Sequence, residues 1–165
     1  MKMLNFSADE LLAVAEEIER NGYIFYSKAA EAASDPSVGA MLRQLAEWEE
    51  QHYEIFRAMR AGLGEREKER TVFDPFDEIG LYLKAYASGK IIRADWDPES
   101  KAAGLKGLAD VLDFALAIEK DSVVYYTGMR QLVPRGLGKD KIDRIIEEEM
   151  KHVAIIASRM AGLDY

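Results

Sequence analysis

Apolar residues recur every three or four positions through four long stretches of the chain, which is the pattern of helices that bury one face. We expect these helices to cover about 8–33, 36–61, 104–132 and 140–160. No stretch alternates apolar and polar residues in the manner of a half-buried strand. The sequence therefore predicts an all-α protein.

Local start and stop signals support these helix boundaries. Ser7 and Glu10 have the spacing of a capping box, with the serine at the N-cap and the glutamate at N3. Asp35 is a favourable N-cap for the second helix, and Pro36 suits its first position. Pro134 ends the third helix. The first two helices are thus expected to form one antiparallel hairpin and the last two another.

The two hairpins are separated by a long connection over 63–103. It begins with a charged run at 64–70, is expected to contain one short amphipathic helix within 75–89, and forms a turn at 94–98. Connections of this length in a compact domain are usually crossovers or functional segments. The predicted architecture is a four-helix bundle of two helical hairpins joined by a crossover that carries a short extra helix. The whole chain, 1–165, is predicted to be one domain.

The second half of the chain repeats the first after a shift of one hundred residues. The segment Glu47-Trp48-Glu49-Glu50-Gln51-His52 aligns with Glu147-Glu148-Glu149-Met150-Lys151-His152 without a gap. Glu19 and Tyr26 align in the same way with Glu119 and Tyr126. The repeat unit is one helical hairpin, as in proteins built from duplicated supersecondary units.

Both histidines of the chain follow a glutamate by three positions, as Glu49/His52 and Glu149/His152. Residues i and i+3 lie on one face of a helix, so each pair can bind one metal ion. In an antiparallel hairpin, residues equally distant from the turn lie at the same level. This places Glu19 beside the first pair and Glu119 beside the second. Six side chains should therefore meet inside the bundle: Glu19, Glu49, His52, Glu119, Glu149 and His152.

Buried carboxylates at this density require compensating charge, since four of them would otherwise repel one another and lose their hydration. Two divalent cations balance four carboxylates. An oxygen-rich donor set with one imidazole per ion favours Fe, with Mn or Zn as alternatives. The simplest arrangement places Glu49 or Glu149 and its histidine on one ion each and leaves Glu19 and Glu119 to bridge or cap the ions. Which glutamates bridge is left open by the spacing. Six further glutamates are expected to face solvent: Glu16, Glu17, Glu47, Glu50, Glu147 and Glu148.

Composition narrows the range of partners. The formal net charge is −8 and the sequence pI is near 4.9, which argues against nucleic acid and anionic membranes as partners. The absence of cysteine excludes disulfides and thiolate metal sites and is compatible with the cytoplasm. The N-terminus has no secretory apolar region, and no run approaches the ~18 apolar residues of a membrane span. A cytoplasmic protein is expected.

One glutamate from each of two helices, together with Glu-x-x-His from each of the other two, is the ligand pattern of ferritin-like di-iron proteins. The segments 18–26 and 49–52 resemble those of rubrerythrin and its relatives. The resemblance covers all four expected helices. It implies a ferritin-like bundle whose di-iron site reacts with hydrogen peroxide or dioxygen. It also implies that Tyr26 and Tyr126 line the site, in a redox role, in a hydrogen-bonding role or simply as core residues.

Two departures from the rubrerythrin pattern affect the expected activity. Rubrerythrins carry a rubredoxin domain with four cysteines, which we do not expect here, so electrons would come from a separate rubredoxin-like partner. Rubrerythrins also place an additional glutamate three residues after the ligand of the third helix, where this chain has Ser122. The expected site is therefore closer to the symmetric bacterioferritin type. This difference bears on peroxidase activity and not on metal binding.

The expected function is that of a redox-active di-metal oxidoreductase that reduces hydrogen peroxide or dioxygen. Two alternatives are an iron-handling protein that oxidises Fe²⁺ for storage and a bundle whose metal is only structural. A homodimer is also expected, and exchange of hairpins between subunits across the crossover is one way to build it.

Overall fold

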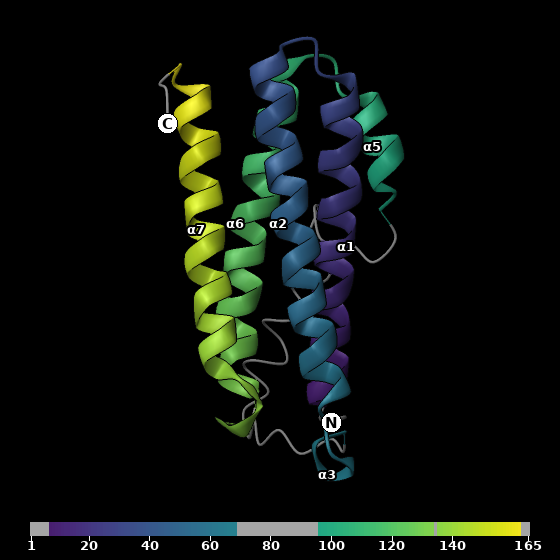
Figure 1. Cartoon of the computed structure of the whole chain (residues 1–165), viewed down its shortest axis with the longest axis vertical. Coiled ribbons are helices and arrows are strands. Elements are labelled where there is room, and N and C mark those ends of the chain that lie inside the picture. Colours follow the sequence, from purple (N-terminus) through teal and green to yellow (C-terminus); the bar gives the residue numbers. More distant parts are fainter. Residues whose placement is uncertain (1–6, 69–95, 134, 163–165) are drawn as a thin grey trace, which may run out of the picture.

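The computed structural model describes residues 7–68, 96–133 and 135–162 (Figure 1). Within these ranges the regular structure is entirely helical, which confirms the all-α prediction. The long helices are α1 (Ala8–Ala32), α2 (Pro36–Ala61), α6 (Leu108–Leu132) and α7 (Lys139–Met160). The short elements are α3 (Glu65–Lys68), α5 (Pro98–Gly104) and the 3₁₀ turn η1 (Arg135–Leu137).

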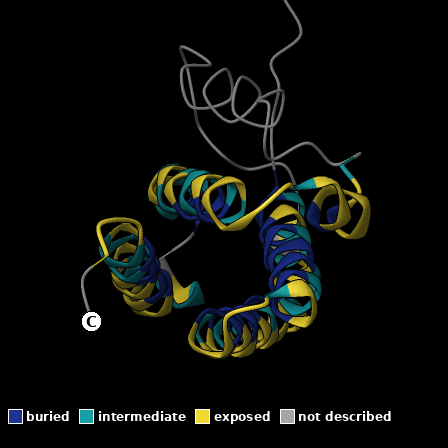
Figure 2. Cartoon of the chain, turned by 90° about the horizontal axis from the view of Figure 1, so that it is seen from above, coloured by how far each residue is buried: buried dark blue, intermediate teal, exposed yellow. Residues whose placement is uncertain are grey.

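The four long helices form the predicted bundle. Helices α1 and α2 pack along each other as one hairpin, and α6 and α7 pack as the second (Figure 1). The two hairpins meet through α1 with α6 and through α2 with α7, and α5 packs on α1. Seen along the bundle axis, the long helices surround a common interior and turn their buried faces toward it (Figure 2). None of the described helices is both long enough and apolar enough to cross a membrane.

The capping signals of the first hairpin act as predicted. Ser7 accepts a hydrogen bond from the backbone N–H of Glu10 at 3.1 Å, and the Glu10 carboxylate accepts one from the Ser7 N–H at 2.9 Å. Asp35 accepts from the backbone N–H of Ser37 at 2.8 Å, with Pro36 at the first helical position. These contacts satisfy backbone donors that have no partner within the helix. They fix where α1 and α2 begin.

The start of the second hairpin differs from the prediction. The helix expected from 104 begins at Leu108, and residues 98–104 form the separate helix α5. Gly107 interrupts the helical path with φ +130, a conformation that glycine adopts far more easily than other residues. Asp97 at the end of the predicted 94–98 turn is the N-cap of α5. The helix expected within 75–89 lies outside the described residues, and the described part of the charged run contains α3.

The bundle has two apolar clusters, one toward each end. One includes Leu11 and Leu12 of α1, Phe56 of α2 and Ile142 and Ile145 of α7. The other is built from the remaining half of each long helix and includes Phe25, Val38, Leu42, Leu45 and Ile156. The middle of the bundle lies between these clusters. It is this middle layer that holds the buried polar side chains.

Candidate metal centre

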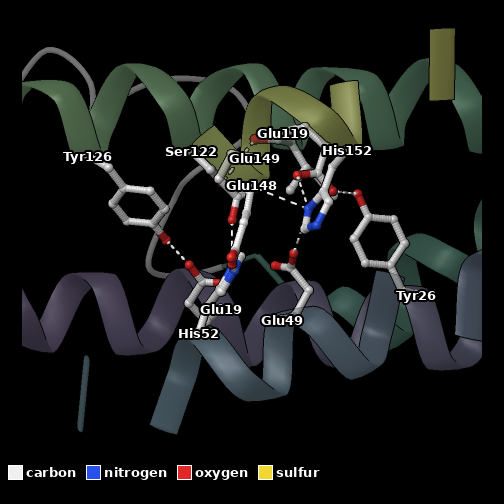
Figure 3. Close-up of polar contacts among 11 residues, drawn as sticks. Glu19, Tyr26, Glu49, His52, Glu119, Ser122, Tyr126, Glu148, Glu149 and His152 are labelled. Carbon is white, nitrogen blue, oxygen red and sulfur yellow. Dashed lines mark hydrogen bonds and ion pairs between the residues drawn. The ribbon is translucent and has the colours of Figure 1, made fainter. Parts of the chain in front are cut away.

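Six ionisable side chains are buried in the middle layer of the bundle, each on the inward face of a long helix (Figure 3). Their exposed fractions are 0% for Glu19, Glu119 and Glu149, 1% for Glu49 and His52, and 3% for His152. They are the six residues singled out by the repeat and the Glu-x-x-His spacing. The structure brings all of them together within one chain.

The six side chains form two overlapping groups. One contains Glu19, Glu49, His52 and Glu149, and the other contains Glu49, Glu119, Glu149 and His152. In each group, one ligand atom per residue lies within 4.8 Å of all the others. Glu49 and Glu149 belong to both groups, whereas Glu19 and Glu119 belong to one each. Glu49 and Glu149 are thus the carboxylates that the two groups share, and Glu19 and Glu119 are not shared.

Both imidazoles turn the same nitrogen, Nδ1, toward the carboxylates. His52 Nδ1 lies 2.7 Å from Glu149 Oε1 and 3.6 Å from Glu19 Oε2. His152 Nδ1 lies 3.3 Å from Glu119 Oε2 and 3.5 Å from Glu149 Oε2. The two rings are stacked, with centroids 5.7 Å apart. Each Nδ1 therefore shares its surroundings with carboxylates of the same group, as a pair of ligands to one ion would.

Several of these polar atoms have no hydrogen-bond partner. The atoms concerned are Glu19 Oε2, Glu49 Oε1, His52 Nδ1 and both carboxylate oxygens of Glu149. The short distance from His52 Nδ1 to Glu149 Oε1 lacks hydrogen-bond geometry, so closeness alone does not satisfy either atom. An unsatisfied buried polar atom costs about 1–3 kcal/mol. Cations between these atoms would remove that cost, so the donor set fits a pair of metal ions.

A glycine makes room for one of the shared carboxylates. A Cβ atom at Gly22 would lie 2.3 Å from Glu49 Oε2, far inside van der Waals contact. The repeat places Ser122 at the equivalent position of the other hairpin, where its hydroxyl donates to the carbonyl oxygen of Ile118 at 3.2 Å. The absence of a side chain at position 22 is therefore part of how the Glu49 carboxylate reaches the centre of the bundle.

Burial and mutual repulsion shift the titration of the glutamates in the absence of metal. Burial, followed by the negative charges of Glu19 and Glu149, raises the pKa of Glu49 well above its usual range. Burial and the proximity of Glu149 raise the pKa of Glu119 to about 8. Glu149 behaves oppositely: burial raises its pKa, but the proximity of Glu119 and of both imidazoles outweighs burial and lowers it. The metal-free cluster thus retains protons that carboxylates in water would release.

The imidazoles are also shifted toward their protonated forms. Burial lowers the pKa of His52, but the charge of Glu19 and the contact with Glu149 more than offset it and raise that pKa to about 12. The same balance, with Glu119 as the main partner, raises the pKa of His152 to about 9. Protons therefore supply the positive charge that the buried carboxylates require. A metal ion must displace these protons in order to bind.

Each of the two tyrosines reaches across to the other hairpin. The Tyr26 hydroxyl of α1 donates to the Glu119 carboxylate of α6. The Tyr126 hydroxyl of α6 donates to Glu19 Oε1 of α1 at 2.5 Å. Burial raises the pKa of both phenols well above 10, and the adjacent carboxylates raise it further, so both hydroxyls remain donors. The tyrosines thus hold the two unshared glutamates in place.

Two contacts of the histidines were not anticipated from the sequence. Glu148, expected to face solvent, has a side chain that is 48% exposed yet lies with Oε2 2.8 Å from His52 Nε2. Trp48 stacks on His152 with ring centroids 4.8 Å apart and an interplanar angle of 12°. Both residues immediately precede the shared glutamates, at equivalent positions of the repeat. Their equivalent positions next to the ligands are the sequence feature that could have indicated these contacts, although one residue is tryptophan and the other glutamate.

Most of the other glutamates expected to face solvent do so. Glu47, Glu50 and Glu147 are exposed. Glu16 and Glu17 are half-buried, and each pairs with an arginine. These side chains lie on the outer faces of α1, α2 and α7 and take no part in the buried cluster.

Comparisons with known proteins agree with this architecture. A sequence model of the ferritin-like domain matches residues 7–161. The crystal structure of a candidate ferritin-like diiron-carboxylate protein from Thermotoga maritima superposes with a TM-score of 0.66, over 93% of this chain and 94% of that one. The two sequences are 23% identical, so the likeness concerns the fold. No curated protein sequence matches the chain.

Proposed function

The chain belongs to the ferritin-like domain family, and from this premise we propose that it is a redox-active di-metal protein. The two ions would be held by the six buried side chains: Glu19, Glu49, His52, Glu119, Glu149 and His152. The observation that carries the proposal is the overlap of two ligand groups through Glu49 and Glu149. Four buried carboxylates do not stabilise a structural core, because apolar side chains of similar volume would give a fold that is at least as stable.

Iron is the proposed occupant of both positions, with Mn or Zn as alternatives. Two divalent ions balance the four carboxylates when both imidazoles are neutral. Oxygen ligands with a single imidazole suit Fe and Mn in particular. Bound Fe²⁺ would act as a Lewis acid and give up one electron per ion, two in total, to an oxidant.

The proposed reaction is the two-electron reduction of hydrogen peroxide, or the reduction of dioxygen. For peroxide, the pair of irons would supply two electrons, which together with two protons convert one H₂O₂ into two waters. A separate rubredoxin-like electron donor would return the two electrons. The chain's own residues would ligate the ions and shield them from bulk water, since the six side chains are nearly inaccessible.

Tyr26 and Tyr126 are proposed to act through hydrogen bonds. Each phenol keeps its proton and donates to the glutamate that serves only one of the ions. Such a bond restricts the rotation of the carboxylate without removing its negative charge. This supports a positioning role more directly than a redox role.

All six proposed ligands come from one chain, so the centre does not need a second subunit to be complete. The predicted homodimer therefore carries no part of the proposed chemistry. Exchange of hairpins between subunits is likewise not required to assemble the site.

The proposal is tested by loading metal-free protein with Fe²⁺ under anaerobic conditions and measuring bound iron. We expect two ions per chain. Stopped-flow mixing with hydrogen peroxide or dioxygen should then oxidise both ions, and a chemical reductant should restore them for repeated turnover. Glu49→Gln should lower the bound iron and slow oxidation, whereas Glu50→Gln, the same change at the adjacent exposed residue, should do neither.

Other outcomes point elsewhere. Accumulation of oxidised iron beyond two ions per chain would favour iron handling. Two bound ions that neither oxidant changes would favour a structural role. Failure to bind two ions would overturn the proposal.

A further inference from the structure

The internal repeat breaks down at the two residues that contact the histidines. Position 48 is tryptophan and position 148 is glutamate, although both directly precede a shared glutamate. The ligands that follow them do repeat, since Glu49 corresponds to Glu149 and His52 to His152. The two ligand sets therefore contain the same residue types, but the residues that contact the two imidazoles from outside differ.

His52 has an anionic partner on its outer nitrogen. With Nδ1 turned to the cluster, Nε2 carries the proton that Glu148 Oε2 accepts across 2.8 Å. A carboxylate in this position fixes the tautomer and the orientation of the ring and makes Nδ1 a stronger donor to metal. Loss of such a partner typically weakens metal binding about 10–100-fold.

Among the described residues, His152 has no comparable partner. Its polar contacts there are all made through Nδ1, and the ring is held through its face by Trp48. Ring stacking limits tilting, but it supplies neither negative charge nor a fixed tautomer.

His152 also lines a surface groove between α2 and α7. The groove has a volume of about 300 Å³ and is bordered by Trp48, Gln51, Glu148, Lys151, His152 and Ile155. His52 does not line it, whereas Glu148, which bonds the outer nitrogen of His52, does. The groove carries both a carboxylate and an ammonium group, so it does not select for cations by charge. What it provides is access to the edge of His152.

From this asymmetry we propose that the two metal positions are inequivalent. The position at Glu19 and His52 holds its ion tightly, with Glu148 as the positioning residue. The position at Glu119 and His152 binds more weakly and exchanges a divalent cation with solvent through the groove between α2 and α7. The inference rests on the proposed metal-binding function and adds to it an order of loading and release.

The inference can be tested by titrating the metal-free protein with Co²⁺ and following binding by calorimetry and by the visible absorption of the bound ion. The wild-type protein should bind two Co²⁺ with dissociation constants that differ at least ~10-fold, in keeping with the range for outer-shell partners. Glu148→Gln should weaken the tighter equivalent by about 10-fold or more and leave the weaker one unchanged. The His152→Gln protein should bind only one Co²⁺ per chain, with the tighter dissociation constant.

A substitution that makes the two hairpins more alike tests the same inference through a gain in affinity at the weaker position. Trp48→Glu places at His152 the residue that the repeat provides at His52. The weaker dissociation constant should then move toward the tighter one, and the slow and fast phases of Co²⁺ release to a chelator should converge. Glu147→Gln is the control for Glu148→Gln. It removes one negative charge from the adjacent, exposed residue and should change neither dissociation constant.

The outcomes separate the inference from the function on which it rests. Two equal dissociation constants in the wild type, or unchanged constants in Glu148→Gln, would overturn the inequivalence and leave di-metal binding standing. A Glu148→Gln protein whose metal-free form unfolds earlier but whose constants are unchanged would show a merely structural role for Glu148. Failure of the wild type to bind two Co²⁺ would overturn both.

Discussion

Replacing Gly22 by alanine should separate metal binding from stability. The new Cβ would lie 2.3 Å from Glu49 Oε2, whereas ordinary van der Waals contact begins near 3.4 Å. The carboxylate must therefore retreat by about 1 Å, while metal–ligand distances tolerate only about 0.2 Å. Because Glu49 belongs to both ligand groups, its displacement removes a bond from each ion. We expect Co²⁺ affinity to fall at least ~100-fold, more than for a change outside the ligand set.

The metal-free protein should become more stable with the same substitution. In the interior of a helix, alanine makes the helical state more stable than glycine does by about 1 kcal/mol. The three nearest atoms all belong to the Glu49 side chain and none to backbone, so we expect the carboxylate to move rather than the backbone of α1. For a chain of 165 residues, about 1 kcal/mol corresponds to a rise of about 2–4 °C in Tm.

The assay pairs thermal unfolding of chelator-treated protein with Co²⁺ titration of the same sample. Gly39→Ala is the matched control, because its Cβ would lie 3.4 Å from Arg43 Nη1 and 3.5 Å from the Ala30 carbonyl oxygen, in ordinary contact. It should gain stability and keep wild-type affinity. A Gly22→Ala protein with wild-type Co²⁺ affinity would refute the assigned role of Glu49, and one that unfolds earlier without metal would refute the idea that only the carboxylate moves.

Three further predictions concern pH, a tyrosine and a helix cap. In the fold the pKa of Glu119 rises from 4.5 to about 8 and that of His152 from 6.5 to about 9, so both favour the folded state only while protonated. Tm of the metal-free protein should therefore fall as pH rises from about 5 to about 9, whereas metal affinity should increase over the same range; a flat Tm profile would contradict the shifts. Tyr126→Phe leaves Glu19 Oε1 without its donor and should cost about 1–3 kcal/mol in metal-free protein, measured by urea unfolding. Ser7→Ala removes the capping box of α1 and should cost about 1 kcal/mol with no change in metal stoichiometry, which calorimetry can verify.

The meeting of the six buried side chains could be predicted because it follows from helix geometry alone. Spacing of three residues puts Glu49 and His52 on one face, and equal distance from a turn puts Glu19 at the same level. Both arguments need only that the helices be regular and antiparallel, and α1 and α2 are long helices joined by a short turn and packed along each other. Whether the six residues bind metal stays a prediction for the titrations above.

The missed features depend on information that a single helix does not contain. Position 148 is rotated by about 100° around the helix axis from the buried position 149. Considered without its neighbours, the helix therefore exposes Glu148 to solvent at the edge of the buried face. Only the approach of α2 brings His52 within its reach. Gly22 is similar, because the need for an absent side chain arises from Glu49 of the neighbouring helix.

Helix α5 is a different kind of omission, since its signal was present in the sequence. Asp97 and Pro98 repeat the N-cap and first-position pair formed by Asp35 and Pro36, and both pairs begin a helix. The prediction has a turn over 94–98 and no helix between that turn and 104, whereas the structure has α5 over Pro98–Gly104. The φ of Gly107, which separates the two helices, cannot be inferred from its being glycine alone.

The difference between Trp48 and Glu148 has a consequence for how such a centre can be constructed. Two identical hairpins associating about a twofold axis would be obliged to place the same residue against both histidines. A chain that contains both hairpins is released from that requirement, because each copy can be altered by itself. Here one copy presents an indole ring and the other a carboxylate, so covalent linkage of the halves gives the protein two histidine environments that can be altered separately, where a symmetric assembly would have a matched pair.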